Sequence, residues 1–197
     1  MTVSAEQIKK IRELTGAGVL DAKKTLEEFN GDFDKALAVL KEKGLKAAEK
    51  KAERVAKQGV IETYVHGVGR IGVMVEVNCE TDFVAATVDF KELAHDIAMQ
   101  IAATKPQYVL PEDVPAAKIA EMKQQFTDAA VADHKPANII EKIVTGKIEA
   151  FYKETCLVRQ PFIRDDSQTI YDRIKLTITK LGENIVVKRF ARFELGE

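Results

Sequence analysis

Few side chains in this sequence are of the types that perform covalent chemistry or bind metal ions. The thiols and imidazoles are spread along the chain, at Cys79, Cys156, His66, His95 and His134. Zinc sites draw ligands from closely spaced pairs of such residues, and Cys79 would have to combine with distant partners. Cys156 has no histidine or asparagine at the spacing of a known nucleophilic motif. The sequence therefore predicts no metal site and points to no nucleophile, and both cysteines are interpreted as buried apolar residues.

Two further patterns have a structural rather than a catalytic interpretation. The stretch TGAGVLDAKKT, residues 15–25, has glycines and lysines but lacks the GxxxxGK[ST] spacing of a phosphate loop and does not follow a strand. It is interpreted as a turn between two helices. The neighbouring acids Asp165 and Asp166 precede an expected helix, where carboxylates are favourable for the helix dipole. An enzyme that makes or breaks covalent bonds is therefore not predicted.

Charge and hydropathy narrow the class of protein. The chain has 30 Lys and Arg against 31 Asp and Glu, a net charge of −1. This balance gives no reason to expect nucleic acid or a membrane surface as a partner. No long apolar run exists, and the opening MTVSAEQIKK is amphipathic rather than a leader sequence. With two widely separated cysteines, the expectation is a soluble cytoplasmic protein in a reducing compartment.

The pattern of residues 1–44 predicts three short helices. The first begins at a capping box made by Ser4 and Gln7 and ends at Gly16, and the third ends at Gly44. A bundle of this size is near the lower limit for an independent core. Docking is therefore a more reasonable role for it than chemistry.

Residues 45–58, LKAAEKKAERVAKQ, are rich in Ala, Lys and Glu, a composition that favours helix without much burial. They are predicted to form a linker helix. Its basic side chains could follow a phosphate backbone, but the interspersed Glu49 and Glu53 are more typical of a solvated face. A non-catalytic RNA- or protein-binding module that uses this basic helix is the alternative function.

Residues 59–197 are predicted to form an α+β core. A period of two in VIETYVHGVGRIGVMVEVN indicates a β-hairpin with its turn at Gly67 and Gly69. Helical spacing then dominates as far as Leu181, and ENIVVKRFARFEL indicates a final strand. Its apolar side is expected to carry Ile185, Val187, Ala191, Phe193 and Leu195. The expected architecture is a small antiparallel sheet covered by helices.

The string NCETDFVAA, residues 78–86, places an acid beside an aromatic residue where the predicted hairpin ends. One interpretation is structural: Thr81 or Asp82 caps the next helix, and Phe83 packs against its first turn. The other is that Asp82 and Phe83 are presented to a partner. The residue pattern by itself favours the structural interpretation.

Six stretches together resemble one known family. They are TGAGVLDAKKTLEEFNGDFDKA, GVIETYV, VEVNCETDFVA, KPANIIEKIVTGKIEAFYKE, QPFIRDD and LGENIVVKRFARFELGE. They are similar to stretches of bacterial and organellar elongation factor Ts, the guanine-nucleotide exchange factor for elongation factor Tu, and the resemblance covers essentially the whole chain. It implies a UBA-like three-helix docking domain at 1–44, a linker helix at 45–58, and an α+β core and dimerisation domain at 59–197. The chain resembles the short form with one copy of the core, which implies a homodimer.

The resemblance implies a role for Thr81, Asp82, Phe83 and Val84. In the family, the Asp-Phe pair enters the GTPase domain of elongation factor Tu near the nucleotide and displaces groups that hold Mg²⁺. This ion needs near-ideal octahedral geometry, so a small shift in its surroundings weakens nucleotide binding. The implied partner is elongation factor Tu, either GDP-bound or nucleotide-free, and no cofactor or metal of its own is implied.

The resemblance implies that Arg12, Val19 and Leu20 dock the N-terminal module on the GTPase domain of elongation factor Tu. Many family members have two methionines where this chain has Val19 and Leu20. The apolar character of the docking contact is therefore kept, but the conformational adaptability of the methionine side chain is lost. From the residues alone, Arg12 belongs to a solvated helix face, and Val19 and Leu20 form the edge of a core.

The resemblance also implies partner contacts for two further pairs of residues. Leu181 and Gly182 match a second contact near the Asp-Phe pair, and His66 and Gly67 match a contact that a second subunit would supply in a dimer. From the residues alone, Gly182 is a helix C-cap and His66 a hairpin-turn residue. The third alternative is a diverged enzyme, which would need a pocket lined by acids or bases with shifted pKa values.

Overall fold

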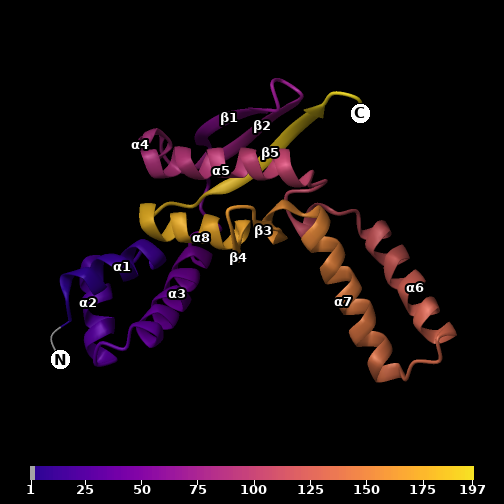
Figure 1. Ribbon diagram of the computed structural model, residues 1–197, viewed down its shortest axis with the longest axis horizontal. Helices are drawn as coiled ribbons and strands as arrows, with labels where there is room; N and C mark the ends of the chain where they lie inside the picture. Colours follow the sequence, from indigo (N-terminus) through magenta and orange to yellow (C-terminus); the bar gives the residue numbers. More distant parts are fainter. Residues whose placement is uncertain (1–2) are drawn as a thin grey trace. The chain divides into compact units, whose positions relative to one another are not determined.

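The computed structural model of the chain describes residues 3–197, which form eight α-helices and two small sheets (Figure 1). The helices are α1 Ala5–Thr15, α2 Val19–Glu28, α3 Phe33–Glu49, α4 Asp82–Ala86, α5 Val88–Thr104, α6 Ala116–Ala132, α7 Ala137–Thr155 and α8 Ile170–Leu181. The strands are β1 Gln58–His66, β2 Ile71–Cys79, β3 Pro161–Phe162, β4 Asp165–Thr169 and β5 Val186–Glu194. The predicted α+β class is confirmed. Within residues 3–197, no helix combines the length and the apolar character that crossing a membrane requires.

The chain divides into two compact units. The first holds the chain up to Thr63 together with Met74–Asp96 and Asp172–Phe190. The second holds Tyr64–Val73, Ile97–Tyr171 and Ala191–Glu197. The strands of the larger sheet and helix α5 contribute residues to both units.

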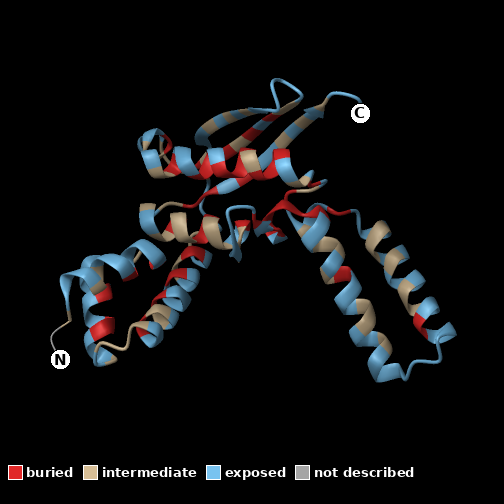
Figure 2. Cartoon of the chain, viewed as in Figure 1, coloured by how far each residue is buried: buried red, intermediate tan, exposed pale blue. Residues whose placement is uncertain are grey.

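Helices α1, α2 and α3 of the first unit pack around a small apolar cluster (Figure 2). Its buried members are Ile11, Ala22, Leu26, Ala36 and Leu40. The capping box of Ser4 and Gln7 forms as predicted, and Gly16 ends α1 with a left-handed φ of 67°. The local signals at the start and end of α1 therefore act as the sequence indicates.

The prediction that the third helix ends at Gly44 is wrong, because α3 continues to Glu49. Gly44 is buried, and a Cβ at this position would lie 3.2 Å from the Thr179 hydroxyl of α8. The hydroxyl of Thr179 donates a hydrogen bond to the Gly44 carbonyl at 3.2 Å. The glycine thus permits close helix packing rather than ending a helix.

The separate linker helix expected over 45–58 does not form. Its first residues belong to α3, and residues 50–57 make turns and irregular chain before β1. The buried side-chain amide of Asn184 donates to the carbonyls of Ala52 and Arg54, at 3.2 and 2.8 Å. Bonds to a distant side chain hold these carbonyls in a non-helical arrangement, which composition alone cannot indicate.

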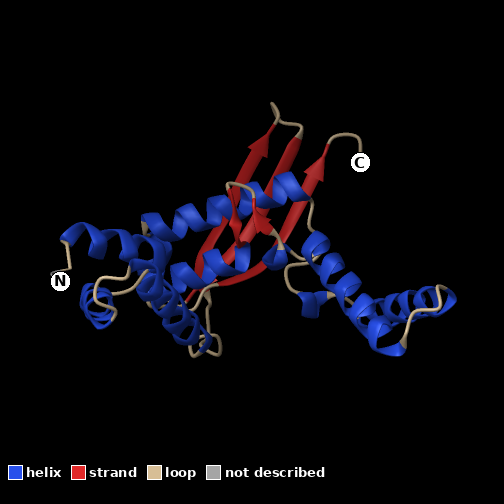
Figure 3. Ribbon diagram, turned by 60° about the horizontal axis from the view of Figure 1, so that its bottom comes forward, coloured by secondary structure: helices blue, strands red, loops and turns tan. Residues whose placement is uncertain are grey.

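The larger sheet has the strand order β1-β2-β5 and is antiparallel (Figure 3). The predicted hairpin of β1 and β2 forms. Its inward side chains on β2, Val73, Val75 and Val77, are buried. In the first unit, α5 contributes buried Phe90, Leu93 and Ala94, and α8 contributes Ile174 and Ile178.

Strand β5 does not keep its apolar residues on one side, so that prediction is wrong. Ile185 and Val187 are buried, but the later members of the expected set, Ala191, Phe193 and Leu195, are exposed. The adjacent residues Lys188 and Arg189 are both exposed, so the alternation shifts by one position there. Because side chains alternate with a period of two, such a shift exchanges the faces.

The second unit contains α6 and α7, which pack side by side as a helical hairpin (Figure 1). The ammonium group of Lys118 lies 5.2 Å from the ring centre of Phe151, and that of Lys147 lies 4.9 Å from the ring centre of Phe126. These cation–π contacts join the two helices along their length.

Asp165 and Asp166 lie on β4 rather than directly ahead of a helix, so their predicted role at a helix dipole is wrong. The carboxylate of Asp165 accepts hydrogen bonds from the backbone N–H and the hydroxyl of Ser167, at 3.2 and 2.6 Å. This acid makes local hydrogen bonds at the start of β4, in the short β3-β4 hairpin.

A substitution at Gly59, at the start of β1, tests how closely β1 and β2 pack. Its φ is +146°, and a Cβ would lie 2.1 Å from the Val77 carbonyl oxygen of β2. Gly59→Ala is expected to lower the free energy of unfolding by about 3 kcal/mol, because the strands must separate. Urea denaturation followed by circular dichroism measures this loss.

Gly72→Ala on β2 is the matched control. Among residues 3–197, apart from Gly72 itself and its two chain neighbours, no atom lies within 4 Å of the position that its Cβ would occupy. Its unfolding free energy should change by no more than about 0.5 kcal/mol. Equal losses for the two variants would contradict the close approach at Gly59.

Candidate functional site

The string NCETDFVAA forms the end of β2, a two-residue loop and the short helix α4. Thr81, not Asp82, caps this helix, because its hydroxyl oxygen accepts a hydrogen bond from the Val84 N–H at 3.3 Å. Phe83 does not pack against the first turn, since 82% of it is exposed. The structural interpretation is therefore correct for the cap and wrong for the aromatic ring.

The loop ahead of α4 is held by a residue that the sequence did not single out, Glu183. One oxygen of its carboxylate accepts from the backbone N–H groups of Glu80 and Thr81, at 3.1 and 3.0 Å. The other oxygen accepts from the Thr81 hydroxyl at 2.6 Å. A sequence signal existed: Glu183 follows the C-terminal end of α8, where an acid is unfavourable for the helix dipole and needs another partner.

These bonds bring two of the predicted contact segments together within the first unit. Gly182 caps α8 with a φ of +83°, and its N–H donates to the Ile178 carbonyl at 2.9 Å. The C-cap interpretation of Gly182 is therefore correct. Leu181 and Gly182 directly precede Glu183, so their turn is tied to the backbone of Thr81.

The three predicted docking residues lie at one end of the N-terminal helices. Arg12 is exposed, and its Nε donates to the Ala17 carbonyl at 3.2 Å, next to the start of α2. Val19 and Leu20 open α2 with 51% and 72% of their surface exposed. They do not form the edge of a core, so that interpretation is wrong, and they present apolar surface to solvent instead.

His66 and Gly67 belong to the second unit and lie at the turn between β1 and β2. The His66 imidazole Nδ1 is 3.0 Å from the Tyr64 hydroxyl, and the two rings stack with their centres 5.9 Å apart. Gly67 has a left-handed φ of 62°. The hydrogen bonds that join Thr81 to Glu183 do not include this turn.

The two cysteines are buried, as predicted. Burial, aided by the negative charges of Glu183 and Asp82, raises the pKa of the Cys79 thiol. Burial also raises the pKa of Cys156. A thiol with a raised pKa is a poor nucleophile at neutral pH. Within residues 3–197, no group of three or more His, Cys, Asp or Glu side chains is arranged to hold a metal ion.

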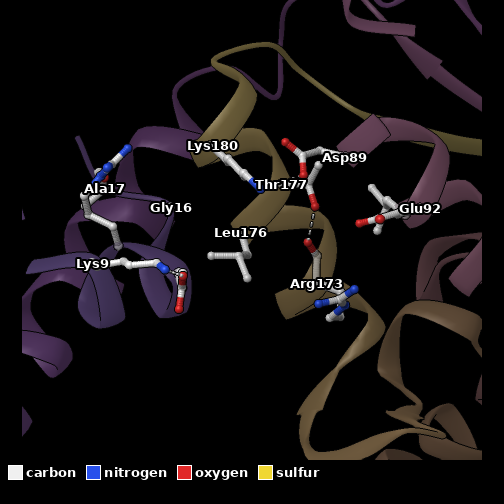
Figure 4. Close-up of a pocket in the computed structure, with 12 residues that line it drawn as sticks. Lys9, Gly16, Ala17, Asp89, Glu92, Arg173, Leu176, Thr177 and Lys180 are labelled. Carbon is white, nitrogen blue, oxygen red and sulfur yellow. Dashed lines mark hydrogen bonds and ion pairs between the residues drawn. The ribbon is translucent and has the colours of Figure 1, made fainter. Parts of the chain in front are cut away.

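A cavity of about 360 Å³ opens in the first unit where α1 approaches α5 and α8 (Figure 4). Its lining includes both acids and bases, and two ion pairs lie within it. Lys180 lies 2.6 Å from Asp89, and Lys9 lies 4.0 Å from Glu13. Neither cysteine nor histidine is among the lining residues in the described part of the chain. The cavity therefore presents acids and bases, four of them in ion pairs, rather than a thiol or an imidazole.

Comparison with known proteins gives full-length matches to one family. The sequence model of the family described as elongation factor TS matches residues 2–197. An elongation factor Ts of Coprothermobacter proteolyticus is 57% identical over 197 residues, which cover 100% of both chains. One of Carboxydothermus hydrogenoformans is 54% identical over 195 residues, covering 99% of this chain and 90% of the relative. One of Moorella thermoacetica is 51% identical over 195 residues, covering 99% of this chain and 96% of the relative.

The string that carries the exposed Phe83 and the turn that carries Glu183 both fall within these matches, as do the three N-terminal helices. The family resemblance noted from the sequence is confirmed over the whole chain. This chain belongs to the elongation factor Ts family of translation elongation factors.

Proposed function

We propose that this chain is a guanine-nucleotide exchange factor that binds elongation factor Tu and accelerates the release of GDP. Membership of the family supports the choice of partner. The observation that carries the mechanism is the exposed side chain of Phe83. It lies on a short helix that follows a loop held by hydrogen bonds to Glu183. Full burial of such a ring is worth about 1.5–3 kcal/mol. That energy is released only when a partner covers it.

The proposed tool is the Asp82-Phe83 pair, with Thr81 and Val84 beside it. The Phe83 ring supplies volume that separates packed elements of the GTPase domain, and the carboxylate of Asp82 supplies a directional polar contact. Mg²⁺ in the partner bridges phosphate oxygens in strict octahedral geometry. A wedge that shifts the groups around this ion weakens the hold on GDP without any covalent step.

Exchange then follows from reciprocal coupling. A factor that binds nucleotide-free elongation factor Tu more tightly than the GDP-bound form must weaken GDP binding by the same ratio. The factor acts on both forms of its partner, and it needs no cofactor of its own. It promotes exchange as a binding protein rather than as an enzyme.

The N-terminal helices provide a second contact with the same partner. The proposed docking surface consists of Arg12, Val19 and Leu20, whose exposed apolar groups lie beside a fixed cation. Leu181 and Gly182 add a contact next to the Asp82-Phe83 pair. The docking surface contributes affinity, whereas Phe83 contributes the displacement that releases the nucleotide.

We further propose that two copies of the chain form a homodimer through the outward faces of those parts of β1, β2 and β5 that belong to the second unit. Exposed apolar side chains there are Val65 of β1 and Phe193 of β5, with Leu195 directly after β5. An exposed apolar sheet face is typical of a surface that a partner covers. In such a dimer, His66 and Gly67 would reach elongation factor Tu from the second subunit.

Phe83→Ala tests the wedge. At saturating factor, GDP release from elongation factor Tu is expected to slow by about 30-fold, the loss of about 2 kcal/mol that is usual for an aromatic anchor. Release of a fluorescent GDP analogue in a stopped-flow instrument measures this rate. The acceleration by the unchanged chain should also shrink when Mg²⁺ is chelated, because the ion is then already absent.

Val55→Ala, which removes another exposed apolar side chain, is the control and should leave release unchanged. If folded Phe83→Ala accelerates release as well as the unchanged chain does, the wedge mechanism is wrong. If the unchanged chain does not accelerate release, the proposed function is wrong.

Leu20→Ala tests the docking surface. The concentration of factor that gives half-maximal acceleration should rise about tenfold, while the maximal rate stays within about twofold, because an affinity contact is lost. A titration of the factor in the same release assay separates the two quantities. Leu45→Ala, on the partly exposed face of α3, should change neither quantity. A fall in the maximal rate alone would argue against a docking role for Leu20.

Phe193→Glu tests the dimer. Sedimentation velocity should show the unchanged chain as a dimer and the variant as a monomer, because an unpaired carboxylate in an apolar interface is strongly unfavourable. Val55→Glu places the same charge on another exposed apolar position and should remain dimeric. A monomeric unchanged chain, or a dimer that tolerates Phe193→Glu, contradicts this interface.

A further inference from the structure

Glu183 lies outside the proposed contact residues, yet it makes three hydrogen bonds to the loop that carries them. Its carboxylate accepts the N–H groups of Glu80 and Thr81 and the hydroxyl of Thr81, all within 3.1 Å. Hydrogen bonds to a charged acceptor are shorter and stronger than neutral ones, and a bidentate arrangement restricts orientation as well as distance. The loop is thus held in one position by a residue about 100 positions away in the sequence.

The contact is reciprocal. The carboxylate of Glu80 accepts from the Asn184 backbone N–H at 2.7 Å and lies 3.6 Å from the guanidinium of Arg54. Each of the two turns therefore supplies an acid that binds the backbone of the other. The amide of Asn184 also donates to the carbonyls of Ala52 and Arg54, which ties in a third segment. All of these groups belong to the first unit.

The position of Phe83 depends on this network. Helix α4 has five residues, too few to be stable without external contacts. Its cap is Thr81, whose hydroxyl donates to Glu183 and accepts from the Val84 N–H. Glu183 therefore orients the group that starts the helix, two residues before Phe83. The ring itself is mostly exposed and contributes little packing that could hold it in place.

We propose that Glu183 is a positioning residue for nucleotide exchange, and that it acts through Phe83. This inference rests on the proposed exchange function. Phe83 can displace the groups around Mg²⁺ only if the loop and the helix that carry it do not move. A loose loop would first have to be ordered, which would reduce the energy with which Phe83 displaces the groups around Mg²⁺. The docking surface, which supplies the affinity, would be unaffected. Glu183 therefore sets the rate of GDP release within the complex more than the affinity of the complex.

A double-mutant cycle in the GDP-release assay tests this role. The variants are Glu183→Ala, Phe83→Ala and the two combined. Glu183→Ala is expected to lower the maximal rate about tenfold, with the half-saturating concentration within about twofold, because the wedge is misplaced rather than absent. If Glu183 acts through Phe83, the combined variant releases GDP no more slowly than Phe83→Ala alone.

Two further variants sharpen the test. Glu62→Ala removes another partly exposed carboxylate of the first unit, one that lies 3.0 Å from the His95 Nδ1, and should leave the maximal rate unchanged. Glu183→Gln keeps an acceptor for the backbone N–H groups but loses the charge, and should recover part of the rate. Thermal unfolding of every variant shows whether it is folded. If Glu183→Ala does not fold, Glu183→Gln takes its place in the cycle.

The outcomes are distinct. A normal maximal rate for Glu183→Ala beside a slow Phe83→Ala overturns the positioning role and leaves the exchange function intact. An equal rate loss from Glu183→Ala with and without Phe83 also overturns it, because the effect then does not pass through the ring. A Phe83→Ala variant as fast as the unchanged chain overturns the exchange mechanism itself.

Discussion

The hydrogen bonds from Glu80 and Thr81 to the Glu183 carboxylate are the interaction on which the exposed loop depends. An aromatic side chain in solvent cannot hold its own position, and a helix of five residues cannot hold it either. The surrounding fold supplies the rigidity. β2 leads the chain into the loop, α8 delivers the turn that follows Gly182, and two acids exchange backbone contacts between them.

Close approach of the backbone supports this arrangement elsewhere in the first unit. Gly44 lets α3 contact α8 at Thr179, and Gly59 lets β1 pass against the Val77 carbonyl of β2. Neither glycine ends an element. In both places the absence of a Cβ shortens the distance between neighbouring elements and thereby fixes their relative position. The N-terminal helices, which carry the proposed docking surface, and α8, which ends at Leu181, are joined in this way.

Local signals predicted most of the individual elements. The capping box of Ser4 and Gln7, the period of two in β2 and the helical spacing of Ile174 and Ile178 all correspond to what forms. The prediction failed where a distant group decided the outcome. α3 passes through Gly44 because α8 packs there, and residues 50–57 leave the helix where Asn184 binds their carbonyls. β5 changes faces at two adjacent charged residues, which a regular alternation does not anticipate.

The sequence by itself determined the α+β class, because it follows from periodicity, and it determined the family and the string that carries Asp82 and Phe83 through the resemblance of six stretches to a known family. Only the tertiary structure decided that Thr81 rather than Asp82 caps α4 and that Phe83 is exposed. It also revealed Glu183 as the partner of Thr81. An acid after α8 indicates that Glu183 needs a partner, but local spacing does not identify Thr81, about 100 positions away, because the hydrogen bond exists only after the helices and strands have packed.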